Sequence, residues 1–436
     1  MKRGAAGTAA ALARLVALAL LAGIPAALMT ALFTDSLAAA VRLIEPIPPH
    51  LRALLPPAAA LAAGMLILRR WPDAGGEGMQ SYINGVSLRG GRLDAPSTLL
   101  KFPATILTLS MCGSGGIVGP LARICAGIGS ALTRLALRAS PPAGGDDLRI
   151  GTVCGFSGAI ASIFHSPLGG ALFAAEILRR DSIRYADVIP AALAGSAAYG
   201  TSAWLLGRGP VFSFESPAPD IGLAGLAWLI PVALGAGAAG MLFIAVFNGA
   251  ARYLHRLRLR QPAPALAGSV LLCAALLLGA GWAFGDSPAL MSTLESGELA
   301  RLPLAETAGG HIAAALLAIT AVKIVLTAVT VGSGMSGGLT GPLLIIGAAA
   351  GALIGTLAGA APGSPFLFAC MACGLSAILG AALNVPLAAI VLTTGMFGTG
   401  YVLPAIAGAI PAFLVFKGRT VYDYFRGDEG GNRDAD

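Results

Sequence analysis

The stretch Gly332-Ser-Gly-Met-Ser-Gly-Gly-Leu-Thr-Gly-Pro342 decides the fold, because a shorter copy of it stands earlier in the chain as Gly113-Ser-Gly-Gly-Ile-Val-Gly-Pro120. Each copy is a glycine cluster that ends in Gly-Pro and opens an apolar segment. Glycine lets the backbone turn tightly, and proline suits the first turn of a helix, where no N–H is needed. The pattern therefore predicts a loop leading into a helix, once in each half of the chain.

A second pair of segments extends this internal repeat. The segment Cys154-Gly-Phe-Ser-Gly-Ala-Ile-Ala-Ser-Ile-Phe-His-Ser-Pro167-Leu168 matches Cys373-Gly-Leu-Ser-Ala-Ile-Leu-Gly-Ala-Ala-Leu-Asn-Val-Pro386-Leu387 without a gap. Many transporters consist of two related halves with the substrate site at their interface. We place the first repeat at residues 71–206 and the second at 264–416, within one transmembrane domain. The match does not say whether the halves run parallel or inverted.

The composition is that of a membrane protein. Of 436 residues, 56% are apolar and 11% are charged, whereas about a quarter of a soluble domain is charged. Between Glu306 and Lys417 the only charged residue is Lys323, and spanning helices need about 20 residues each. The alternating pattern of a membrane β-barrel is absent, so we expect an all-α polytopic membrane protein.

The net charge of +7 comes from basic clusters at the predicted cytoplasmic edges of the spans, and it does not indicate a nucleic-acid partner. These clusters are Arg69 and Arg70; Arg179, Arg180 and Arg184; Arg252, Arg256, Arg258 and Arg260; and Lys417 and Arg419. A short polar tail, 417–436, ends the chain, and we expect it to be cytoplasmic.

A helix that begins inside the membrane presents free N–H groups and the positive end of its dipole, which together can hold an anion. The two glycine loops could therefore converge on one anion. The expected donors are Gly116, Ile117, Val118 and Gly119 in the first loop and Gly338, Leu339, Thr340 and Gly341 in the second. A second interpretation stays open, in which the glycines only allow helices to pack closely.

At these residues the chain resembles the CLC family of chloride channels and chloride/proton antiporters, from about Trp71 to Lys417. The segment from Lys323 to Pro342 is similar to the family's lysine followed by GSGxxGGxFxP. Gly155 through Glu176 and Gly374 through Pro404 resemble its paired helices. The resemblance implies a CLC-type fold of two inverted repeats with broken, re-entrant helices, a homodimer with one pore per subunit, and selectivity for anions. We expect no CBS domain after the second repeat.

The departures from the family pattern concern its two proton-carrying glutamates. The outer one stands in Gly-Arg-Glu-Gly-Pro, and the corresponding loop here has Val118 in its place. The inner one follows the glutamate that Glu176 matches, and Ile177 stands there. Neither carboxylate of the family's exchangers is therefore present.

Other family positions complete the expected anion site. The phenylalanine of GxFxP corresponds to Thr340, and the pore tyrosine aligns with Thr399, with Tyr401 close by as a substitute. The family's first motif, Gly-Ser-Gly-Ile-Pro, falls near Gly78 and Met79, where its anion-facing serine has no clear counterpart. We therefore add Gly78, Met79, Thr399 and Tyr401 to the predicted anion-binding residues.

Two charged residues near the predicted site admit two roles each. Glu77 is a candidate gate or proton carrier, since desolvation raises a carboxyl pKa, or it is a helix-start carboxylate stabilised by the dipole. Lys323 is an intramembrane charge, which suggests that it sets the positive field of the pathway. Alternatively, Lys323 is bonded to carbonyls at the interface of the repeats.

Two further residues are weaker proton candidates. Glu176 precedes Arg179 and Arg180, so a structural ion pair is the competing role. His165 stands where the second repeat has Asn384, and we interpret it as a cap at the start of a helix, with proton handling as the alternative.

These observations predict transport of a chloride-like anion, by passive channel-type conduction through a pore in each subunit. One alternative is a proton-coupled anion or fluoride antiporter that uses Glu77, Glu176 or His165. Another is a family member that conducts nothing and acts as a membrane partner. We expect no enzymatic activity, no cofactor and no metal. The expected partners are a small inorganic anion, the lipid bilayer and a second copy of the chain, in a bacterial inner membrane.

Overall fold

The computed structural model describes residues 2–139, 146–180, 182–217, 222–256, 260–284, 288–302 and 311–422. Most of the predicted tail, 423–436, lies outside these residues. Every regular element in the described ranges is a helix. The α-helices are α1 (Lys2–Ile44), α2 (Pro49–Arg52), α3 (Leu55–Ala63), α4 (Met79–Leu88), α5 (Ala95–Ser110), α6 (Val118–Ala139), α7 (Asp147–Phe164), α8 (Pro167–Glu176), α9 (Tyr185–Gly200), α10 (Leu223–Arg256), α11 (Ala263–Leu277), α12 (Pro288–Ser296), α13 (Ile312–Gly332), α14 (Thr340–Leu357), α15 (Pro365–Ala382), α16 (Pro386–Phe397) and α17 (Val402–Phe416). Short turns are η1 (Gly64–Leu68), η2 (Pro72–Ala74), η3 (Thr201–Leu205), η4 (Ala280–Ala283), η5 (Leu299–Arg301) and η6 (Thr399–Tyr401).

Within the described ranges, eight helical stretches are long and apolar enough to cross a membrane. Several other helices are too short to do so, among them α8 and α16. α8 has 10 residues and α16 has 12. At 1.5 Å per residue they measure about 15 and 18 Å, less than a hydrocarbon core of about 30 Å. They are broken helices of the kind that the sequence predicts.

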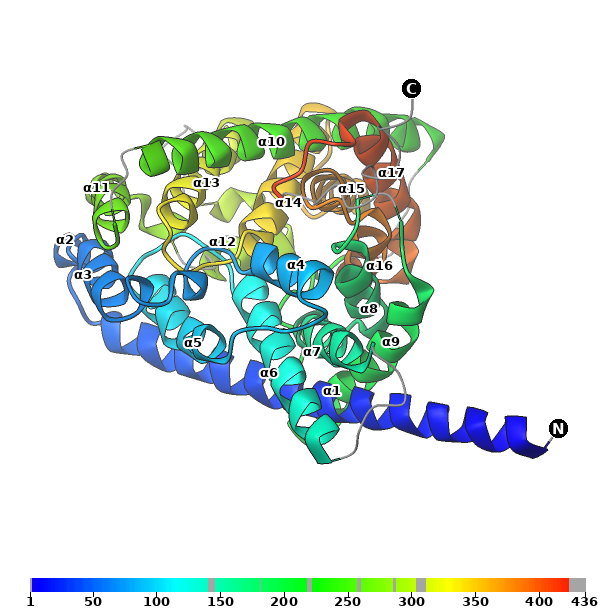
Figure 1. Ribbon diagram of the computed structural model, residues 1–436. Helices are drawn as coiled ribbons and strands as arrows, with labels where there is room; N and C mark the ends of the chain where they lie inside the picture. The colour runs from blue at the N-terminus through cyan, green and yellow to red at the C-terminus, as the bar shows by residue number, and fades with distance from the viewer. Residues whose placement is uncertain are drawn as a thin grey trace, which may run out of the picture.

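The two long helices α1 and α10 each cover one repeat. α1 packs on α5, α6, α7 and α9, whereas α10 packs on α13, α14, α15 and α17. Figure 1 shows α1 and α10 on opposite edges of the bundle, with the remaining helices between them. The interface of the two repeats therefore lies inside the molecule.

Glycines of the matched Cys-Gly segments explain why equivalent helices pack so closely in both repeats. α6 packs on α7, and α14 packs on α15. A Cβ atom on Gly155 would lie 2.2 Å from the carbonyl oxygen of Cys125, and one on Gly374 would lie 2.4 Å from that of Gly347. No side chain fits at either place, so these helix pairs meet backbone to backbone.

His165 and Asn384 occupy equivalent places in the two repeats, but neither caps a helix start. Both have left-handed backbones, with φ of 51° and 60°, a conformation in which Asn and His are enriched. His165 ends α7. The hydroxyl of Ser166 accepts the N–H of Gly169 and caps α8. The prediction that His165 caps the start of a helix is therefore wrong.

Candidate functional site

The two glycine loops contact each other through their backbones. The N–H of Gly116 donates to the carbonyl of Gly338 over 2.8 Å, and the N–H of Gly338 donates to the carbonyl of Gly116 over 2.7 Å. Such a reciprocal pair relates the loops by a local two-fold axis. The loops converge as the sequence predicts. However, the N–H groups of Gly116 and Gly338 are used in this pairing, so these two predicted donors are not available to an anion.

The pairing requires glycine on both sides. A Cβ atom on Gly338 would lie 2.8 Å from the carbonyl oxygen of Gly116 and 2.9 Å from the nitrogen of Gly119. A Cβ atom on Gly116 would lie 2.9 Å from the nitrogen of Gly341. These neighbours are backbone atoms that cannot move aside. Close packing is therefore one real role of these glycines.

A third loop, residues 75–78, joins this pair. The N–H of Gly76 donates to the carbonyl of Gly334 over 3.2 Å, and the N–H of Gly337 donates to the carbonyl of Gly76 over 3.3 Å. Gly78 has a φ of 101° and directly precedes Met79, where α4 begins. We call residues 75–79, 113–120 and 332–342 together the loop cluster; α4, α6 and α14 all begin there.

The helix starts in the loop cluster leave backbone donors without partners. Within the described part of the chain, the N–H groups of residues 117–119 and 339–341 donate to no protein group. The buried hydroxyl of Thr340 also has no partner there. Unpaired N–H groups at the positive end of a helix dipole are the donors of an anion site that lacks a fixed cation.

The carboxylate of Glu77 lies in the loop cluster. One oxygen accepts the N–H of Met79 over 2.9 Å, and the other accepts the hydroxyl of Tyr422 over 2.7 Å. A Cβ atom on Gly119 would lie 3.4 Å from the same carboxylate, which places it against the start of α6. Glu77 lies outside the candidate spans, and burial raises the pKa of its carboxyl to about 7, although the hydrogen bonds from Tyr422 and Met79 lower it.

A fully buried lysine, Lys101 of α5, holds the third loop in place. Its ammonium donates to the carbonyls of Gly75 and Gly76, each over 3.0 Å, and approaches Ser336 of the second loop at 3.4 Å. A Cβ atom on Gly78 would lie 2.7 Å from the Lys101 side chain. Burial lowers the pKa of Lys101 to about 7, although Glu77 raises it, so this ammonium is partly charged at neutral pH beside the Glu77 loop. The sequence analysis did not single out Lys101.

Arg123 of α6 is the second buried cation there. Its guanidinium donates to the hydroxyls of Ser81 over 2.6 Å and Thr98 over 2.8 Å, and the residue is 2% exposed. In the described ranges neither Lys101 nor Arg123 forms an ion pair. Arg123 and the charged fraction of Lys101 therefore place buried positive charge beside the loop cluster, which favours an anion.

The position of Lys101 was detectable from the repeat. The segment Lys101–Pro120 matches Lys323–Pro342 without a gap, with the same separation of 222 residues at both ends (323 − 101 and 342 − 120). Hydroxyl pairs across the interface follow the same symmetry: Thr105 with Ser336 at 2.8 Å, and Ser114 with Thr327 at 3.0 Å. Extending the repeat upstream of the glycines would have identified Lys101 as the partner of Lys323.

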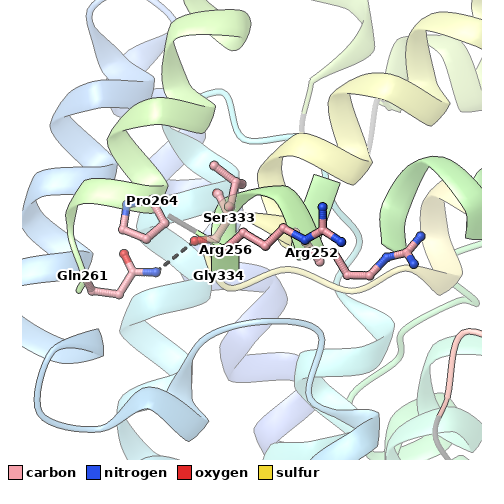
Figure 2. A pocket seen from close by; sticks show the side chains of 9 residues that line it. Arg252, Arg256, Gln261, Pro264, Ser333 and Gly334 are labelled. Atoms are coloured by element: carbon pink, nitrogen blue, oxygen red, sulfur yellow. Dashed lines mark hydrogen bonds between the residues drawn. The ribbon is translucent and has the colours of Figure 1, made fainter. Parts of the chain in front are cut away.

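A pocket of about 670 Å³ lies beside the second glycine loop, at the end of α10. Figure 2 shows Gln261 at one end of it and Arg252 at the other, with Arg256, Ser333 and Gly334 between them. The carbonyl of Gly334 accepts the N–H of Gly76, so the pocket wall is continuous with the loop cluster.

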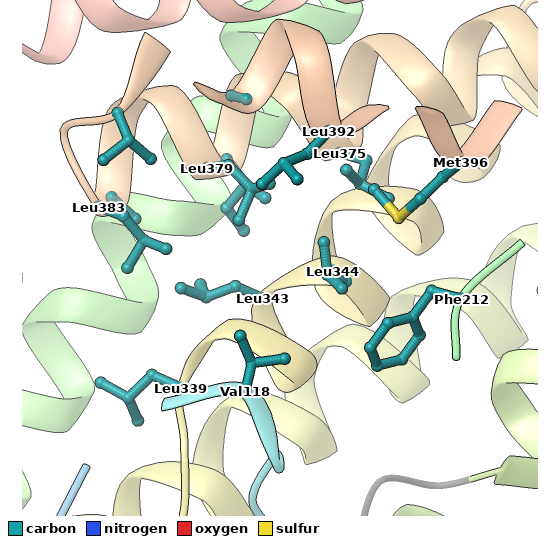
Figure 3. Packing of buried hydrophobic residues seen from close by; sticks show 14 of the residues in the cluster. Val118, Phe212, Leu339, Leu343, Leu344, Leu375, Leu379, Leu383, Leu392 and Met396 are labelled. Atoms are coloured by element: carbon teal, nitrogen blue, oxygen red, sulfur yellow. The ribbon is translucent and has the colours of Figure 1, made fainter. Parts of the chain in front are cut away.

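Val118, where the family pattern expects a carboxylate, is fully buried among apolar side chains. Figure 3 shows it beside Leu339 and Leu343, with Leu379 and Leu383 on the far side of the cluster. Its side chain can neither carry a proton nor bind an anion. If Val118 contributes to an anion site, it does so only through its N–H group.

Lys323 is fully buried and donates to the carbonyl of Ala283 over 3.0 Å. The hydroxyl of Ser114, at the start of the first glycine loop, donates to the same carbonyl over 3.3 Å. The interpretation that Lys323 is bonded to a carbonyl between the repeats therefore describes its contact. The ammonium of Lys323 is linked to the first glycine loop through the Ala283 carbonyl, which accepts from both Lys323 and Ser114.

Glu176 has a structural role, but with a partner that the sequence did not indicate. Its carboxylate oxygens accept the N–H groups of Leu387 over 3.0 Å and Ala388 over 2.8 Å, and so cap α16. No ion pair joins it to Arg179 or Arg180 in the described ranges. Glu176 therefore bonds to the start of α16, where the helix dipole stabilises a carboxylate, and not to the expected arginines.

Thr399 and Tyr401 do not join the loop cluster. Thr399 is exposed, and the hydroxyl of Tyr401 donates to the carbonyl of Pro217 over 2.8 Å. The tyrosine that reaches the site is Tyr422, which lies beyond the other end of α17, a helix of 15 residues and about 22 Å. The prediction that the pore tyrosine corresponds to Thr399, with Tyr401 as its substitute, is therefore wrong. The tyrosine that contacts the loop cluster is Tyr422.

Comparison with known proteins agrees with this architecture. A family described as voltage gated chloride channel matches residues 58–417. A putative chloride channel protein, ClcB-like, from Ralstonia nicotianae is 28% identical over 370 residues, which cover 83% of this chain and 82% of the relative. The voltage-gated ClC-type chloride channel ClcB of Citrobacter koseri is 26% identical over 367 residues, covering 82% of each chain.

Solved structures share the fold. A CLC-type fluoride/proton antiporter superposes with a TM-score of 0.76 at 21% identity, covering 94% of this chain and 97% of the other. A slow cyanobacterial Cl⁻/H⁺ antiporter superposes with a TM-score of 0.74 at 20% identity, covering 92% and 94%. With two inverted repeats, broken helices and a family match over most of its length, this chain is a multi-pass membrane protein that belongs to the voltage-gated chloride channel (CLC) family of anion channels and transporters.

Proposed function

We propose that this member of an anion-transporting family conducts a small, chloride-like anion passively, through a pore in each subunit. The observation that supports the proposal is that the carboxylates in and near the loop cluster form no continuous route for a proton. Glu77 is the one carboxylate in the loop cluster, Val118 is apolar, and Glu176 is bonded to the start of α16. A coupled exchanger needs a continuous proton route, and Ile177, beside Glu176, is buried and apolar.

The proposed mechanism replaces the water shell of the anion with protein donors. The unpaired N–H groups at the starts of α6 and α14 and the hydroxyl of Thr340 supply neutral donors. Lys101 and Arg123 add positive field without binding the ion so tightly that it cannot leave. No bond is made or broken, and the proposal requires no cofactor or metal.

The direct test is anion efflux from liposomes that contain the purified chain. Chloride and fluoride would be followed with ion-selective electrodes, with and without a potassium ionophore as an electrical shunt. Passive conduction predicts fast efflux that depends on the shunt. Absence of any anion efflux from folded protein would support the alternative of a non-conducting membrane partner.

Proton-coupled transport is the second candidate, and Glu77 favours it. A buried carboxylate with a pKa near 7 and a hydrogen bond from Tyr422 can exchange protons at physiological pH. Fluoride is a possible substrate of such an exchanger. Glu77→Gln distinguishes the two functions, because it would abolish proton coupling in an exchanger and would leave a passive channel conducting.

We also propose a homodimer in a bacterial inner membrane. The short helices α8 and α16 end inside the bilayer, yet Leu168 and Leu387 near their starts are 52% and 45% exposed. Helix ends at membrane depth are tolerated where protein covers them. A second copy of the chain on this face would supply that cover, and crosslinking in native membranes would test it.

A further inference from the structure

The pocket beside the second glycine loop has a positively charged wall that transport does not explain. Arg252 and Arg256 lie four residues apart, on one face of α10, and both are exposed. In the described ranges neither forms an ion pair, and no acidic residue lines the pocket. Two like charges at this spacing repel each other, and an anion between them would remove that repulsion.

The end of the pocket at Gln261 holds an acceptor that lacks a donor. The amide nitrogen of Gln261 donates to the carbonyl of Ser333 over 2.9 Å. Its amide oxygen is buried and accepts no hydrogen bond from the described residues. A ligand that fits this pocket therefore combines an anionic group that binds the two arginines with a hydroxyl or amine that donates to the Gln261 amide oxygen.

The pocket lies where the membrane surface is expected. It is formed at the C-terminal ends of two spanning helices, α10 and α13, where the basic residues predict the cytoplasmic side. Tyr253, on the last turn of α10, is 67% exposed, as is typical of an aromatic residue at the headgroup level. Basic pockets between spanning helices on this side are suited to lipid headgroups.

We propose that this pocket binds the headgroup of an anionic phospholipid whose phosphodiester contacts Arg252 and Arg256 and whose headgroup hydroxyl donates to Gln261. A glycerol headgroup has this chemistry. The bound lipid would contact Ser333 and Gly334, and the carbonyl of Gly334 holds the Glu77 loop through Gly76. The site goes beyond the proposed function and holds for passive and for coupled transport.

Native mass spectrometry of the delipidated full chain, titrated with phosphatidylglycerol or phosphatidylcholine, tests the proposal. We expect one phosphatidylglycerol to be retained per subunit and little phosphatidylcholine. Arg252→Gln/Arg256→Gln should weaken phosphatidylglycerol binding at least about ten-fold, since charged hydrogen bonds are lost. The control Arg179→Gln/Arg180→Gln removes the same charge from another exposed basic pair and should bind as the unmodified chain does.

Two further arms separate the headgroup from other ligands. Gln261→Leu should weaken phosphatidylglycerol several-fold. It should leave phosphatidic acid unchanged at a pH where its phosphate is fully ionised and has no O–H group to donate. Inorganic phosphate and glycerol 3-phosphate at millimolar concentration should not displace the lipid. Displacement by either would show a site for soluble phosphate and overturn the lipid assignment, and equal lipid binding by the double arginine variant would overturn the site itself.

Discussion

In the proposed pathway, Glu77 lies beside the donors at the start of α6 and occupies the N–H of Met79, a predicted anion-binding residue. Its carboxylate takes the N–H at the start of α4 and the hydroxyl of Tyr422, and it lies against the start of α6. A carboxylate in this position competes with an anion for the same groups. Conduction therefore requires that Glu77 be displaced or protonated.

Replacing the charge of Glu77 should release the pathway. Glu77→Gln keeps the size of the side chain but removes the competing charge. We expect shunted chloride efflux to rise about ten-fold, the equivalent of one charged hydrogen bond of ~1.5 kcal/mol. The matched control is Glu295→Gln, a carboxylate that accepts the N–H of Ser213 away from the loop cluster. Unchanged efflux in a folded Glu77→Gln protein would contradict the competing role.

The same competition predicts a pH dependence. Burial raises the pKa of Glu77 to about 7, with Lys101 and the Tyr422 hydroxyl facing it and lowering that pKa. The carboxylate is charged above this value and neutral below it. Burial also lowers the pKa of Lys101 to about 7, so this ammonium gains its charge over the same range. Efflux at symmetric pH should therefore rise as the pH falls from 8 to about 6, and Glu77→Gln should reduce this rise to the part that Lys101 causes. A flat profile for the unmodified chain would exclude protonation of Glu77 as the release step.

Single residues show what a sequence can and cannot predict about the site. Glu77 stands beside a recognisable motif, so its place in the loop cluster was predictable. Tyr422 follows the last span in a short polar tail, and its contact with Glu77 crosses 345 residues. No local pattern indicates where such a tail folds back, and Tyr401, in a familiar sequence context, was a more attractive but incorrect choice.

At the scale of elements, the repeat was predictable because glycine and proline have strict local requirements. The two loops, the helices that follow them and the broken helices α8 and α16 all agree with the pattern. The pairing of Gly116 with Gly338 was not predictable, since it depends on how the halves face each other. That pairing uses the N–H groups of Gly116 and Gly338. In the described ranges it leaves the N–H groups of residues 117–119 and 339–341 without a protein acceptor.

The pairing can be tested with neighbouring glycines. Gly338→Ala places a Cβ atom 2.8 Å from a backbone oxygen, so we expect the loops to separate and anion efflux to fall below detection. Gly337→Ala is the control, because its Cβ atom would lie 3.5 Å from Gly115, an ordinary contact. Efflux should survive Gly337→Ala at close to its original rate. Normal efflux from Gly338→Ala would mean that the loops need not touch.

Packing between α7 and α9 includes a buried ion pair. Arg149 donates to both oxygens of Asp187, each over 2.6 Å. Asp187→Asn would leave a buried guanidinium without its charge partner, at a cost of roughly 3–5 kcal/mol. Asp146→Asn breaks the exposed pair with Arg184 and should cost about 0–1 kcal/mol. Thermal unfolding in detergent should separate the two variants, and equal midpoints would contradict the structural role of the buried pair.

At the scale of the whole molecule, contacts between distant segments bring the basic clusters together. A Cβ atom on Gly418 would touch the guanidinium of Arg180, and one on Gly64 would touch Pro262, next to the arginines at the end of α10. Tyr422 and Gln261 both approach the loop cluster from these segments, at Glu77 and Ser333. This arrangement is what we would expect if these segments share the cytoplasmic face that the basic residues predict.

We expect anions to cross this protein without moving protons. The most direct measurement is internal pH in liposomes loaded with chloride, while an outward chloride gradient and an electrical shunt are applied at equal pH on both sides. The account predicts rapid chloride efflux with no proton movement beyond that of protein-free vesicles. Proton uptake that follows the chloride gradient and disappears in Glu77→Gln would contradict it and identify an exchanger.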